Sequence, residues 1–299
     1  MTKSVAVFGL GSMGFGMAQS CLRAGLRVYG FDVVAANVDR FRAAGGATGA
    51  LDTVAPTLDA ALLVVLNAEQ VEAVLFGADG LVPHLAPGAV VMVSATVPPE
   101  FTREMARRTA AEGIHYLDAP VSGGSVKAAE GALGIMDSGT PAAFGAAEPV
   151  LAATAATVFR LGDAAGAGSA MKAVNQLLAG VHIATMAEAM AFGLTQDIAP
   201  ATFLEVISQC AGTSWMLENR APHVVAGDYT PHSQMRIWPK DLGIVLASAK
   251  ATGLETPIAE AALARYQEAM AMGLGPEDDA AVVKVYARDA GLTLPDGST

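Results

Sequence analysis

The chain has 299 residues, 53% of them hydrophobic and 16% charged, so it is long and apolar enough for two domains with separate cores. Acidic residues outnumber basic ones by 29 to 18, and the net charge of −11 argues against nucleic acid or an anionic membrane as a partner. The two cysteines lack metal-binding or redox spacing, and the sequence contains no run of about 18 apolar residues. We therefore expect a reduced, cytoplasmic protein with no metal site. A small anionic substrate is still compatible with this charge, because a few well-placed basic residues set the local field.

The first 32 residues have the organisation of a dinucleotide-binding unit. An apolar run at 4–9 predicts a strand, a glycine-rich turn follows, and the apolar spacing over 13–24 predicts a helix. A second apolar run at 26–31 predicts a strand that ends in Asp32, 18 residues after Gly14. Strand, glycines, helix, strand and terminal acid in this order favour a Rossmann-type fold over an ordinary strand–turn–helix.

The glycine spacing G-x-G-x-x-G indicates where the cofactor binds. Gly9 permits a tight turn, Gly11 lets the backbone approach a pyrophosphate, and Gly14 lets the helix lie close to the sheet. Asp32 is expected to accept hydrogen bonds from the adenosine ribose. Because no arginine occurs at 33–39 to bind a 2′-phosphate, we predict NAD rather than NADP. The cofactor-binding residues predicted from this stretch are Gly9, Leu10, Gly11, Ser12, Met13, Gly14 and Asp32.

Further strands then alternate with helical segments. Apolar runs predict strands at 62–66, 89–94, 114–118, 132–136 and 157–161. Such continuous runs are typical of parallel strands that are covered on both faces. After Gly168 the strand pattern ends, and helices are predicted at 170–193, 200–210, 239–252, 257–272 and 277–288. The predicted fold class is therefore α/β, with a doubly wound, mostly parallel sheet over 1–164 and an all-helical domain over 165–299.

The long helix within 166–193 is apolar on nearly every side, which is typical of a buried helix, and Ser169 is its expected N-cap. Lys172, Asn175 and Gln176 lie at i, i+3 and i+4, so they project from one face. The ordinary interpretation is a lysine that extends to solvent beside two satisfied amides. We favour the wall of a binding site, because buried charges are rare unless they are paired or functional.

Polar loops follow three of the predicted strands at their carboxyl ends, where ligands bind in sheets of this kind. These loops lie at 66–68, 94–96 and 118–124, the last with the sequence DAPVSGG. Successive backbone N–H groups of Ser122, Gly123 and Gly124 would form a cradle suited to a carboxylate. A glycine turn without a ligand explains the same residues equally well.

Three further expectations concern the helical part. Gly180 predicts close packing of the long helix against a neighbour. Pro239 suits the first position of a helix, which would place Lys240 in the opening turn. The stretch 212–220 could border a ligand site, although core packing is the simpler interpretation of Trp215.

With these motifs in place, the chain resembles the β-hydroxyacid dehydrogenase family, which includes 3-hydroxyisobutyrate, tartronate semialdehyde and 6-phosphogluconate enzymes. The resemblance covers essentially the whole chain and rests on GLGSMG at 9–14, DAPVSGG at 118–124, GAGSAMKAVNQ at 166–176 and KDLG at 240–243. It implies a Rossmann-type domain, then an all-helical domain whose first long helix spans the cleft and often completes a dimer. The partners it implies are a small hydroxy-acid substrate and further copies of the chain, as a homodimer or homotetramer.

The motif match also implies roles for individual residues. Lys172 matches the catalytic lysine, which takes the hydroxyl proton while NAD⁺ accepts a hydride from the carbinol carbon. The family commonly has two asparagines after this lysine, and because the second is Gln176 here, either Asn175 or Gln176 could meet the substrate hydroxyl. The residues matched to the substrate carboxylate are Ser122, Gly123 and Gly124, and those expected at the cofactor are Leu66, Asn67, Thr96 and Lys240.

Several stretches are most similar to the L-threonate dehydrogenases of this family, namely 64–77, 176–184, 212–220 and 227–231. A histidine often takes the position of Asn175 in that group, so the chain departs from it there. The similarity implies NAD-dependent oxidation of L-threonate to 2-oxo-tetronate (2-dehydro-L-erythronate). The alternatives are 3-hydroxyisobutyrate or a tartronate semialdehyde-type acid as substrate, imine reduction by enzymes that usually lack the lysine, and a non-catalytic protein that senses NAD or a metabolite.

Overall fold

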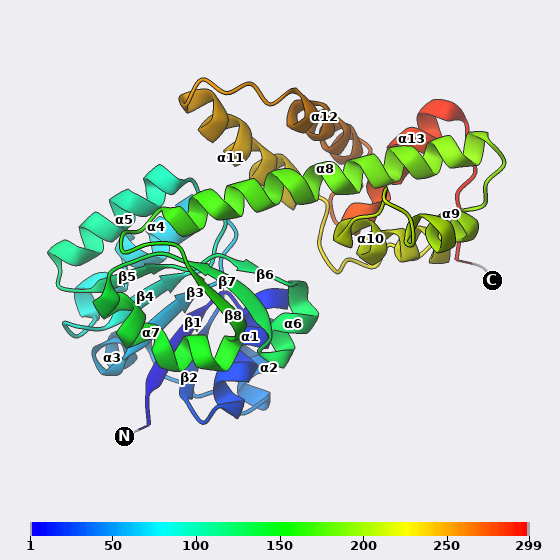
Figure 1. Ribbon diagram of the computed structural model, residues 1–299. Helices are drawn as coiled ribbons and strands as arrows, with labels where there is room; N and C mark the ends of the chain where they lie inside the picture. The colour runs from blue at the N-terminus through cyan, green and yellow to red at the C-terminus, as the bar shows by residue number, and fades with distance from the viewer. Residues whose placement is uncertain (1, 298–299) are drawn as a thin grey trace. The chain divides into compact units, whose positions relative to one another are not determined.

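The computed structural model describes residues 2–297, and the chain divides into two units, Met1–Lys172 and Ala173–Thr299 (Figure 1). The N-terminal unit is built on a five-stranded parallel sheet in the order β2-β1-β3-β4-β5. Its strands are β1 (Ser4–Phe8), β2 (Arg27–Phe31), β3 (Ala60–Leu63), β4 (Val90–Val93) and β5 (His115–Asp118). Because the strand order reverses direction beside β1, the glycine-rich turn after β1 lies at the point where such sheets bind ligands.

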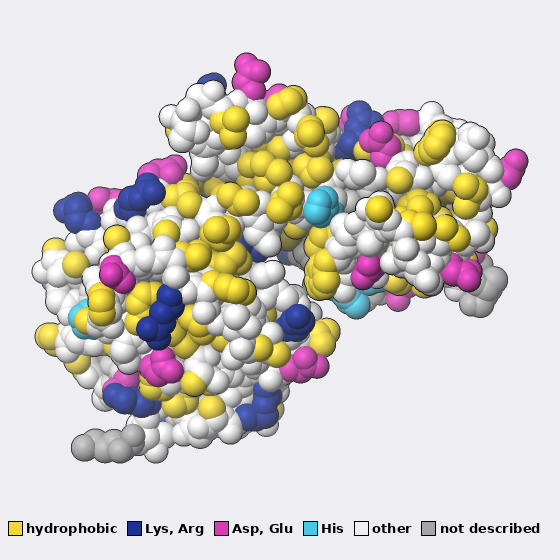
Figure 2. Space-filling view, in the orientation of Figure 1, with side chains coloured by type: hydrophobic (Ala, Val, Ile, Leu, Met, Phe, Trp, Pro, Cys, Tyr) yellow, Lys and Arg dark blue, Asp and Glu magenta, His cyan; other side chains and the backbone are white. Residues whose placement is uncertain are grey.

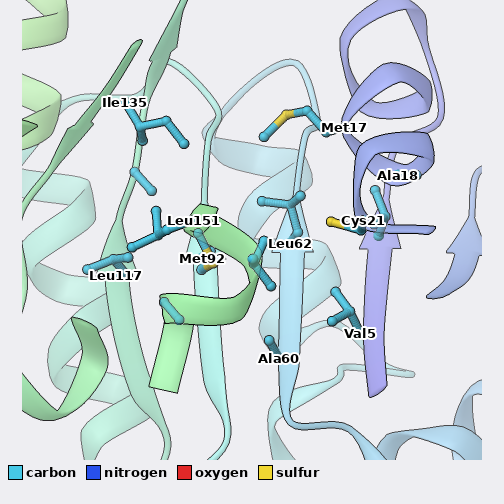
Figure 3. Packing of buried hydrophobic residues seen from close by; sticks show 14 of the residues in the cluster. Val5, Met17, Ala18, Cys21, Ala60, Leu62, Met92, Leu117, Ile135 and Leu151 are labelled. Atoms are coloured by element: carbon cyan, nitrogen blue, oxygen red, sulfur yellow. The ribbon is translucent and has the colours of Figure 1, made fainter. Parts of the chain in front are cut away.

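Helices cover both faces of this sheet because successive side chains of each strand point to opposite sides. Val5 belongs to the buried cluster on one face, together with Met17 and Cys21 (Figure 3), whereas its neighbour Ala6 belongs to the cluster on the other face, together with Leu75. The first face is covered by α1 (Ser12–Arg23), α2 (Ala35–Ala43), α6 (Gly124–Glu130) and α7 (Pro141–Thr154). The second is covered by α3 (Leu51–Val54), η1 (Ala55–Thr57), α4 (Ala68–Phe76), η2 (Val82–His84) and α5 (Pro99–Ala111). The doubly wound arrangement predicted from the apolar runs is confirmed.

A second, three-stranded sheet follows in the order β6-β7-β8. Its strands are β6 (Val121–Ser122), β7 (Leu133–Asp137) and β8 (Ala155–Arg160), with β6 antiparallel and β8 parallel to β7. The pair at β6 was not predicted, because two residues carry no periodic pattern. The prediction that every strand is covered on both faces is wrong for β8, in which four of six residues are exposed.

The C-terminal unit is entirely helical within the residues that the structure describes. Its elements are the greater part of α8 (Ala167–Thr195), then α9 (Pro200–Ile207), α10 (Trp215–Ala226), α11 (Ile237–Ala251), α12 (Pro257–Ala271), η3 (Asp279–Val282) and α13 (Val283–Ala290). Gly180 packs as expected, because a Cβ there would lie 3.0 Å from the ring of Trp238. The hydroxyl of Tyr266 also donates to the Gly180 carbonyl at 2.8 Å.

Two expectations for this unit are wrong. Pro239 is the third residue of α11, not the first; a proline is tolerated there because N–H groups of a first helical turn have no partner inside the helix. Trp215 opens α10 and is 55% exposed instead of packing in the core. The buried residues of that stretch are Leu217 and Arg220, and Arg220 Nε lies 2.5 Å from Asp279, so its charge serves the fold.

Within residues 2–297, α8 is the one helix long and apolar enough to cross a membrane by length and composition. Its residues Ile183, Met186 and Met190 are buried in the core that the helical unit builds around it. Helices at the centre of a globular unit commonly have this composition. We conclude that α8 is a core helix and not a membrane span.

Candidate functional site

The turn between β1 and α1 can adopt its shape only with glycine at two positions. Gly9 has a φ of +90°, and a Cβ there would lie 2.4 Å from the Val64 carbonyl oxygen. A Cβ at Gly14 would lie 1.8 Å from the carbonyl oxygen of Gly9. At Gly11, by contrast, a Cβ would meet no other described atom within 4 Å. Packing inside the chain therefore explains Gly9 and Gly14, whereas Gly11 leaves space for a ligand close to the backbone.

The first turn of α1 offers free donors beside this space. The helix begins at Ser12 after Gly11, and no side chain caps its N-terminal N–H groups. No acidic residue lies in that turn, so no side chain of the turn itself offsets the partial positive charge of the helix end. These features suit the pyrophosphate of a dinucleotide, because phosphate groups bind favourably at helix N-termini.

Asp32 and Arg40 hold the glycine-rich turn by hydrogen bonds to the backbone N–H and the carbonyl oxygen of Leu10. Asp32 Oδ2 accepts from the N–H of Leu10 at 2.6 Å, and its Oδ1 accepts from the N–H of Val34 at 2.8 Å. Arg40 Nη2 donates to the Leu10 carbonyl at 3.0 Å, and the guanidinium lies 3.9 Å from the centroid of the Phe15 ring. Asp32 therefore stands at the expected place, at the end of β2, with both oxygens already bonded to the backbone. No sequence pattern indicated the contact between Arg40 and Leu10, which are 30 residues apart.

The loops after β3 and β4 place the other residues expected at the cofactor. Asn67 caps α4, because its Oδ1 accepts from the N–H of Gln70 at 2.9 Å, and Leu66 beside it is 47% exposed. After β4, Thr96 is half-buried. Two residues earlier, the hydroxyl of Ser94 is buried without a hydrogen-bond partner among residues 2–297. A buried orphan hydroxyl at the carboxyl end of a strand is consistent with a polar ligand group that completes its bonding.

The expected carboxylate cradle lies between β6 and α6. Ser122 ends β6 and is half-buried, and Gly123 and Gly124 have φ values of +133° and +77°. Both glycines therefore occupy conformations that other residues rarely adopt. The aliphatic stem of Lys127 packs over Gly123, at 2.9 Å from the position that a Cβ would occupy. This lysine was not identified from the sequence, because a single lysine in a short helix has no distinguishing pattern.

The first half of α8 has three buried polar residues on one side and three exposed apolar residues on the other. Ser169, Lys172 and Gln176 have exposed fractions of 2%, 9% and 6%. On the other side of the helix, Met171, Val174 and Leu178 are 44%, 56% and 50% exposed. The expectation that the apolar helix is buried all round is wrong here. Polar residues at i, i+3 and i+7 that are withdrawn from water on a largely apolar helix indicate a functional face.

The start of α8 is held by Asp118, the last residue of β5. Asp118 Oδ2 accepts from the N–H groups of Gly166 and Ser169 at 3.0 and 2.8 Å, and Oδ1 accepts from the Ser169 hydroxyl at 2.6 Å. Ser169 is therefore not the N-cap that the sequence suggested, because it lies inside the helix and Asp118 takes its N–H. Burial raises the pKa of Asp118, while these hydrogen bonds act in the opposite direction.

A second buried carboxyl group lies at the end of the neighbouring strand β7. Asp137 is fully buried, and neither of its carboxyl oxygens has a hydrogen-bond partner among residues 2–297. Burial raises its pKa to about 7; the charge of Asp118 adds to the increase and Arg160 opposes it. The sequence predicted the strand but attached no significance to the acids that end β5 and β7.

Past Lys172, the two amides of α8 form a chain of contacts with α11. Asn175 Nδ2 donates to Gln176 Oε1 at 2.9 Å, and Gln176 Nε2 donates to Asp241 Oδ2 at 2.5 Å. The other carboxyl oxygen of Asp241 lies 2.5 Å from Nζ of Lys240. Asp241 was quoted in a motif without a role, yet it connects the amide pair with the lysine expected to bind the cofactor.

Comparison with known proteins identifies the protein family to which this chain belongs. The family model described as the NAD binding domain of 6-phosphogluconate dehydrogenase matches residues 4–162. A second model, described as NAD-binding of NADP-dependent 3-hydroxyisobutyrate dehydrogenase, matches residues 166–286. The chain belongs to the 3-hydroxyisobutyrate dehydrogenase family. It is accordingly an oxidoreductase that acts on the CH–OH group of a hydroxy acid with NAD or NADP.

Full-length relatives within this family are similar throughout. The L-threonate dehydrogenase of Cupriavidus necator is 48% identical over 296 residues, which covers 99% of both chains. The L-threonate dehydrogenase of Escherichia coli K12 is 47% identical over 97% of this chain and 96% of its own. A crystal structure described as 3-hydroxyisobutyrate dehydrogenase from Salmonella typhimurium is 46% identical, with a TM-score of 0.89 over 95% of this chain and 99% of that one.

Membership of the 3-hydroxyisobutyrate dehydrogenase family accounts for the features that chain packing leaves unexplained. The open space at Gly11 and the uncapped start of α1 suit the dinucleotide that the family binds. The buried polar face of α8 carries the lysine that the family resemblance assigns to catalysis.

Proposed function

We propose that the chain oxidises L-threonate to 2-oxo-tetronate with NAD as the acceptor and Lys172 as the general base. The observation that carries the proposal is the buried Lys172 on α8, 9% exposed between Ser169 and Gln176 on the polar face of an otherwise apolar helix. The named substrate rests on the L-threonate dehydrogenases that are 45–48% identical over nearly the full chain.

Lys172 acts on the proton of the reacting hydroxyl. The dinucleotide, when bound, supplies the hydride acceptor for the carbinol carbon. The neutral amine of Lys172 takes the hydroxyl proton as the carbonyl forms, and in reverse its ammonium returns that proton to the oxygen. A buried amine suits this task because burial penalises the charged form of a lysine. General acid–base assistance of this kind is typically worth about 10²–10⁴-fold in rate.

The substrate carboxylate is assigned to the backbone cradle at Ser122, Gly123 and Gly124. The positive φ values of both glycines support this role, since turns of this kind direct successive N–H groups to one side. Fixing the carboxylate orients the adjacent C2 carbinol, and orientation contributes to rate because it removes the entropy cost of finding a reactive geometry.

Asn175 is the amide that we assign to the substrate hydroxyl. Gln176 uses its oxygen to accept from Asn175 and its nitrogen to donate to Asp241, so its polar atoms are occupied. The bond that Asn175 donates leaves its carbonyl oxygen to accept from a ligand hydroxyl. Gln176 then serves to orient Asn175.

We assign NAD, in preference to NADP, from the surroundings of the β2 end. Asp32 would repel a 2′-phosphate, and the next residues, Val33 and Val34, are exposed and carry no charge. Arg40 is engaged by the Leu10 carbonyl and the Phe15 ring. Gly9 to Gly14, Leu66, Asn67, Thr96 and Lys240 are kept as the remaining cofactor contacts.

A second candidate substrate class is favoured by one observation. The crystal structure from Salmonella typhimurium, described as a 3-hydroxyisobutyrate dehydrogenase, is nearly as similar to this chain as the L-threonate dehydrogenases are. 3-Hydroxyisobutyrate carries a methyl group on C2, where L-threonate carries the hydroxyl that we assign to Asn175. A site that hydrogen-bonds a hydroxyl rejects an analogue without it by as much as 10⁴–10⁵-fold. Asn175 on the polar face of α8 therefore favours the polyhydroxy acid.

A panel of hydroxy acids tests the substrate. The purified enzyme is assayed by absorbance of the reduced cofactor with L-threonate, D-threonate and 3-hydroxyisobutyrate, each with NAD and with NADP. Tartronate semialdehyde is assayed in the reductive direction, with NADH and with NADPH. We expect the highest kcat/KM with L-threonate and NAD. A higher kcat/KM with 3-hydroxyisobutyrate would make that acid the substrate in place of L-threonate. No turnover of any acid would favour a non-catalytic sensor of NAD or a metabolite.

The protein is further proposed to act as a cytoplasmic homodimer or homotetramer, with functional domains at 1–164 and 165–299. Many apolar side chains remain on the surface of the C-terminal unit, where yellow patches are visible in Figure 2. They include Leu178, Phe192, Ile198, Val206, Trp215, Leu254 and Ile258. Exposed apolar surface of this extent is typical of a protein–protein interface. Sedimentation equilibrium would measure the assembly directly.

A further inference from the structure

The first turn of α8 is joined to the ends of two strands by a buried cluster of four side chains. Asp118 ends β5, Ser138 follows β7, Thr102 lies on α5, and Ser169 lies on α8 itself. All four are at most 2% exposed. The cluster lies wholly within the N-terminal unit, which extends to Lys172.

Asp118 satisfies donors that a helix N-terminus leaves without partners. Its oxygens accept from the N–H groups of Gly166 and Ser169, and from the hydroxyls of Ser138 and Ser169 at 2.9 and 2.6 Å. Ser138 Oγ accepts in turn from the N–H of Gly168 at 2.9 Å. The backbone N–H groups of Gly166, Gly168 and Ser169 are thus bound by the Asp118 carboxylate and by the hydroxyl of Ser138, which itself donates to that carboxylate. The negative charge is also favourable at this end of the helix.

Steric contacts prevent the helix start from shifting toward the strands. A Cβ at Gly168 would lie 2.3 Å from the carbonyl oxygen of Met136 and 3.0 Å from Asp118 Oδ2. Ser169 Oγ also lies 2.9 Å from Thr102 Oγ1, which fixes the helix from the side of α5. Hydrogen bonds and close packing therefore determine the same position for this turn.

We propose that Asp118 is a positioning residue for the reaction, because it fixes the first turn of α8 and thereby the place of Lys172. Lys172 follows Ser169 by three residues, so its backbone lies about 4.5 Å further along the same rigid helix. Ser122, Gly123 and Gly124 follow Asp118 closely in the chain, so the acid connects the base with the cradle assigned to the substrate carboxylate. The inference rests on the proposed function in which Lys172 is the base. A displacement of about 1 Å in such a group is enough to lower a rate by about 10²-fold.

The test compares two buried serines of the N-terminal unit. Ser169→Ala removes a hydroxyl from the cluster, and Ser20→Ala removes one from α1, where Ser20 is 3% exposed and donates to the Ala128 carbonyl at 3.0 Å. We expect both variants to lower Tm similarly and to leave the Kd for NAD within about twofold. Ser169→Ala should lower kcat about tenfold and increase the deuterium isotope effect on kcat with substrate labelled at the carbinol carbon, because proton and hydride transfer become slower. Ser20→Ala should change neither kcat nor the isotope effect.

Substitutions of the acid give a second readout. Asp118→Asn keeps an oxygen that can accept from Gly166 and Ser169, and its amide can donate to Ser169 Oγ, so kcat should fall less than in Asp118→Ala. If Asp118→Ala does not fold, Ser138→Ala takes its place. The proposal is overturned if kcat of Ser169→Ala matches that of Ser20→Ala, or if the alanine variant at the acid, or its substitute, retains wild-type kcat.

A double variant separates this proposal from the proposed function. In a Lys172→Ala background, Ser169→Ala should leave the residual rate unchanged, because the residue through which it acts is gone. A further tenfold loss would show that the serine acts elsewhere and would overturn the positioning role. If Lys172→Ala alone retains wild-type turnover, it is the assignment of the base that fails.

Discussion

The side-chain amide of Gln176 donates to the carboxylate of Asp241 at 2.5 Å, across 65 residues of sequence. Both side chains are buried, with exposed fractions of 6% and 4%. The same carboxylate pairs with Lys240. Asp241 therefore holds both Gln176, which orients the amide proposed to bind the substrate, and Lys240, the lysine proposed to contact the cofactor.

The first prediction follows from this shared carboxylate. Asp241→Asn removes the charge that pairs with Lys240 and weakens the acceptor for Gln176, so the KM values for both the acid and NAD should rise several-fold. Lys240→Met removes the cation but leaves the bond between Gln176 and Asp241, so only the KM for NAD should rise. Steady-state kinetics with each ligand varied in turn distinguish the two variants. Equal effects of both variants on the acid KM would contradict the role given to Gln176.

A second prediction concerns the choice between NAD and NADP. Val33 is fully exposed beside Asp32, so Val33→Arg should cost little stability while placing a guanidinium where a 2′-phosphate would lie. We expect the ratio of kcat/KM for NADP to that for NAD to rise at least tenfold, and to rise further when Asp32→Ser is added. Phe159→Arg, at another exposed apolar position of the N-terminal unit, is the control for a change in net charge. An unchanged ratio in Val33→Arg would place the adenosine ribose elsewhere.

A third prediction uses the buried acid at the end of β7. Because burial raises the pKa of Asp137 to about 7 in the folded chain, the folded state binds more protons than the unfolded state between about pH 4 and pH 7. The free energy of unfolding should therefore fall as the pH rises through this window, by up to about 1.4 kcal/mol per pH unit from this group.

Asp137→Asn tests this dependence, since no hydrogen bond to the carboxylate is lost among the described residues. The variant should be more stable than the wild type at pH 8 and should lose less stability between pH 5 and pH 8, as measured by urea unfolding. Asp79→Asn, at an exposed position, should leave the pH dependence unchanged. If Asp137→Asn shows the wild-type pH dependence, the titrating group lies elsewhere.

Local patterns in the sequence were sufficient to predict the fold and the positions of part of the candidate site. The glycine-rich turn, the strands around it and Lys172 are all encoded by spacing within a few residues, and the structure has them where they were expected. The pairing of Gln176 with Asp241, and of Asp118 with the start of α8, joins residues 51 to 65 positions apart. Such contacts depend on tertiary packing, which no local period records. The sequence signal for both acids was their place at the end of a predicted apolar strand or directly after it, and Asp118 also opens the DAPVSGG motif.

The errors have the same origin. Ser169 was expected to cap α8 because serine commonly does so, but the helix begins two residues earlier, at Ala167. The buried carboxylate of Asp118 accepts from the N–H groups of Gly166 and Ser169 at this helix start instead. The apolar composition of α8 indicated a helix buried all round, whereas Met171, Val174 and Leu178 are exposed. Composition alone cannot distinguish core burial from surface that another chain could cover.

The role of Lys172 as the base is tested by the turnover of Lys172→Ala with L-threonate and NAD. We expect kcat to fall by about 10²–10⁴-fold while the Kd for NAD, measured by fluorescence titration, stays within about twofold. Lys284→Ala is the matched control: it removes a lysine of α13 that pairs with Glu277, and it should retain wild-type kcat. Wild-type turnover by Lys172→Ala would show that Lys172 is not the base.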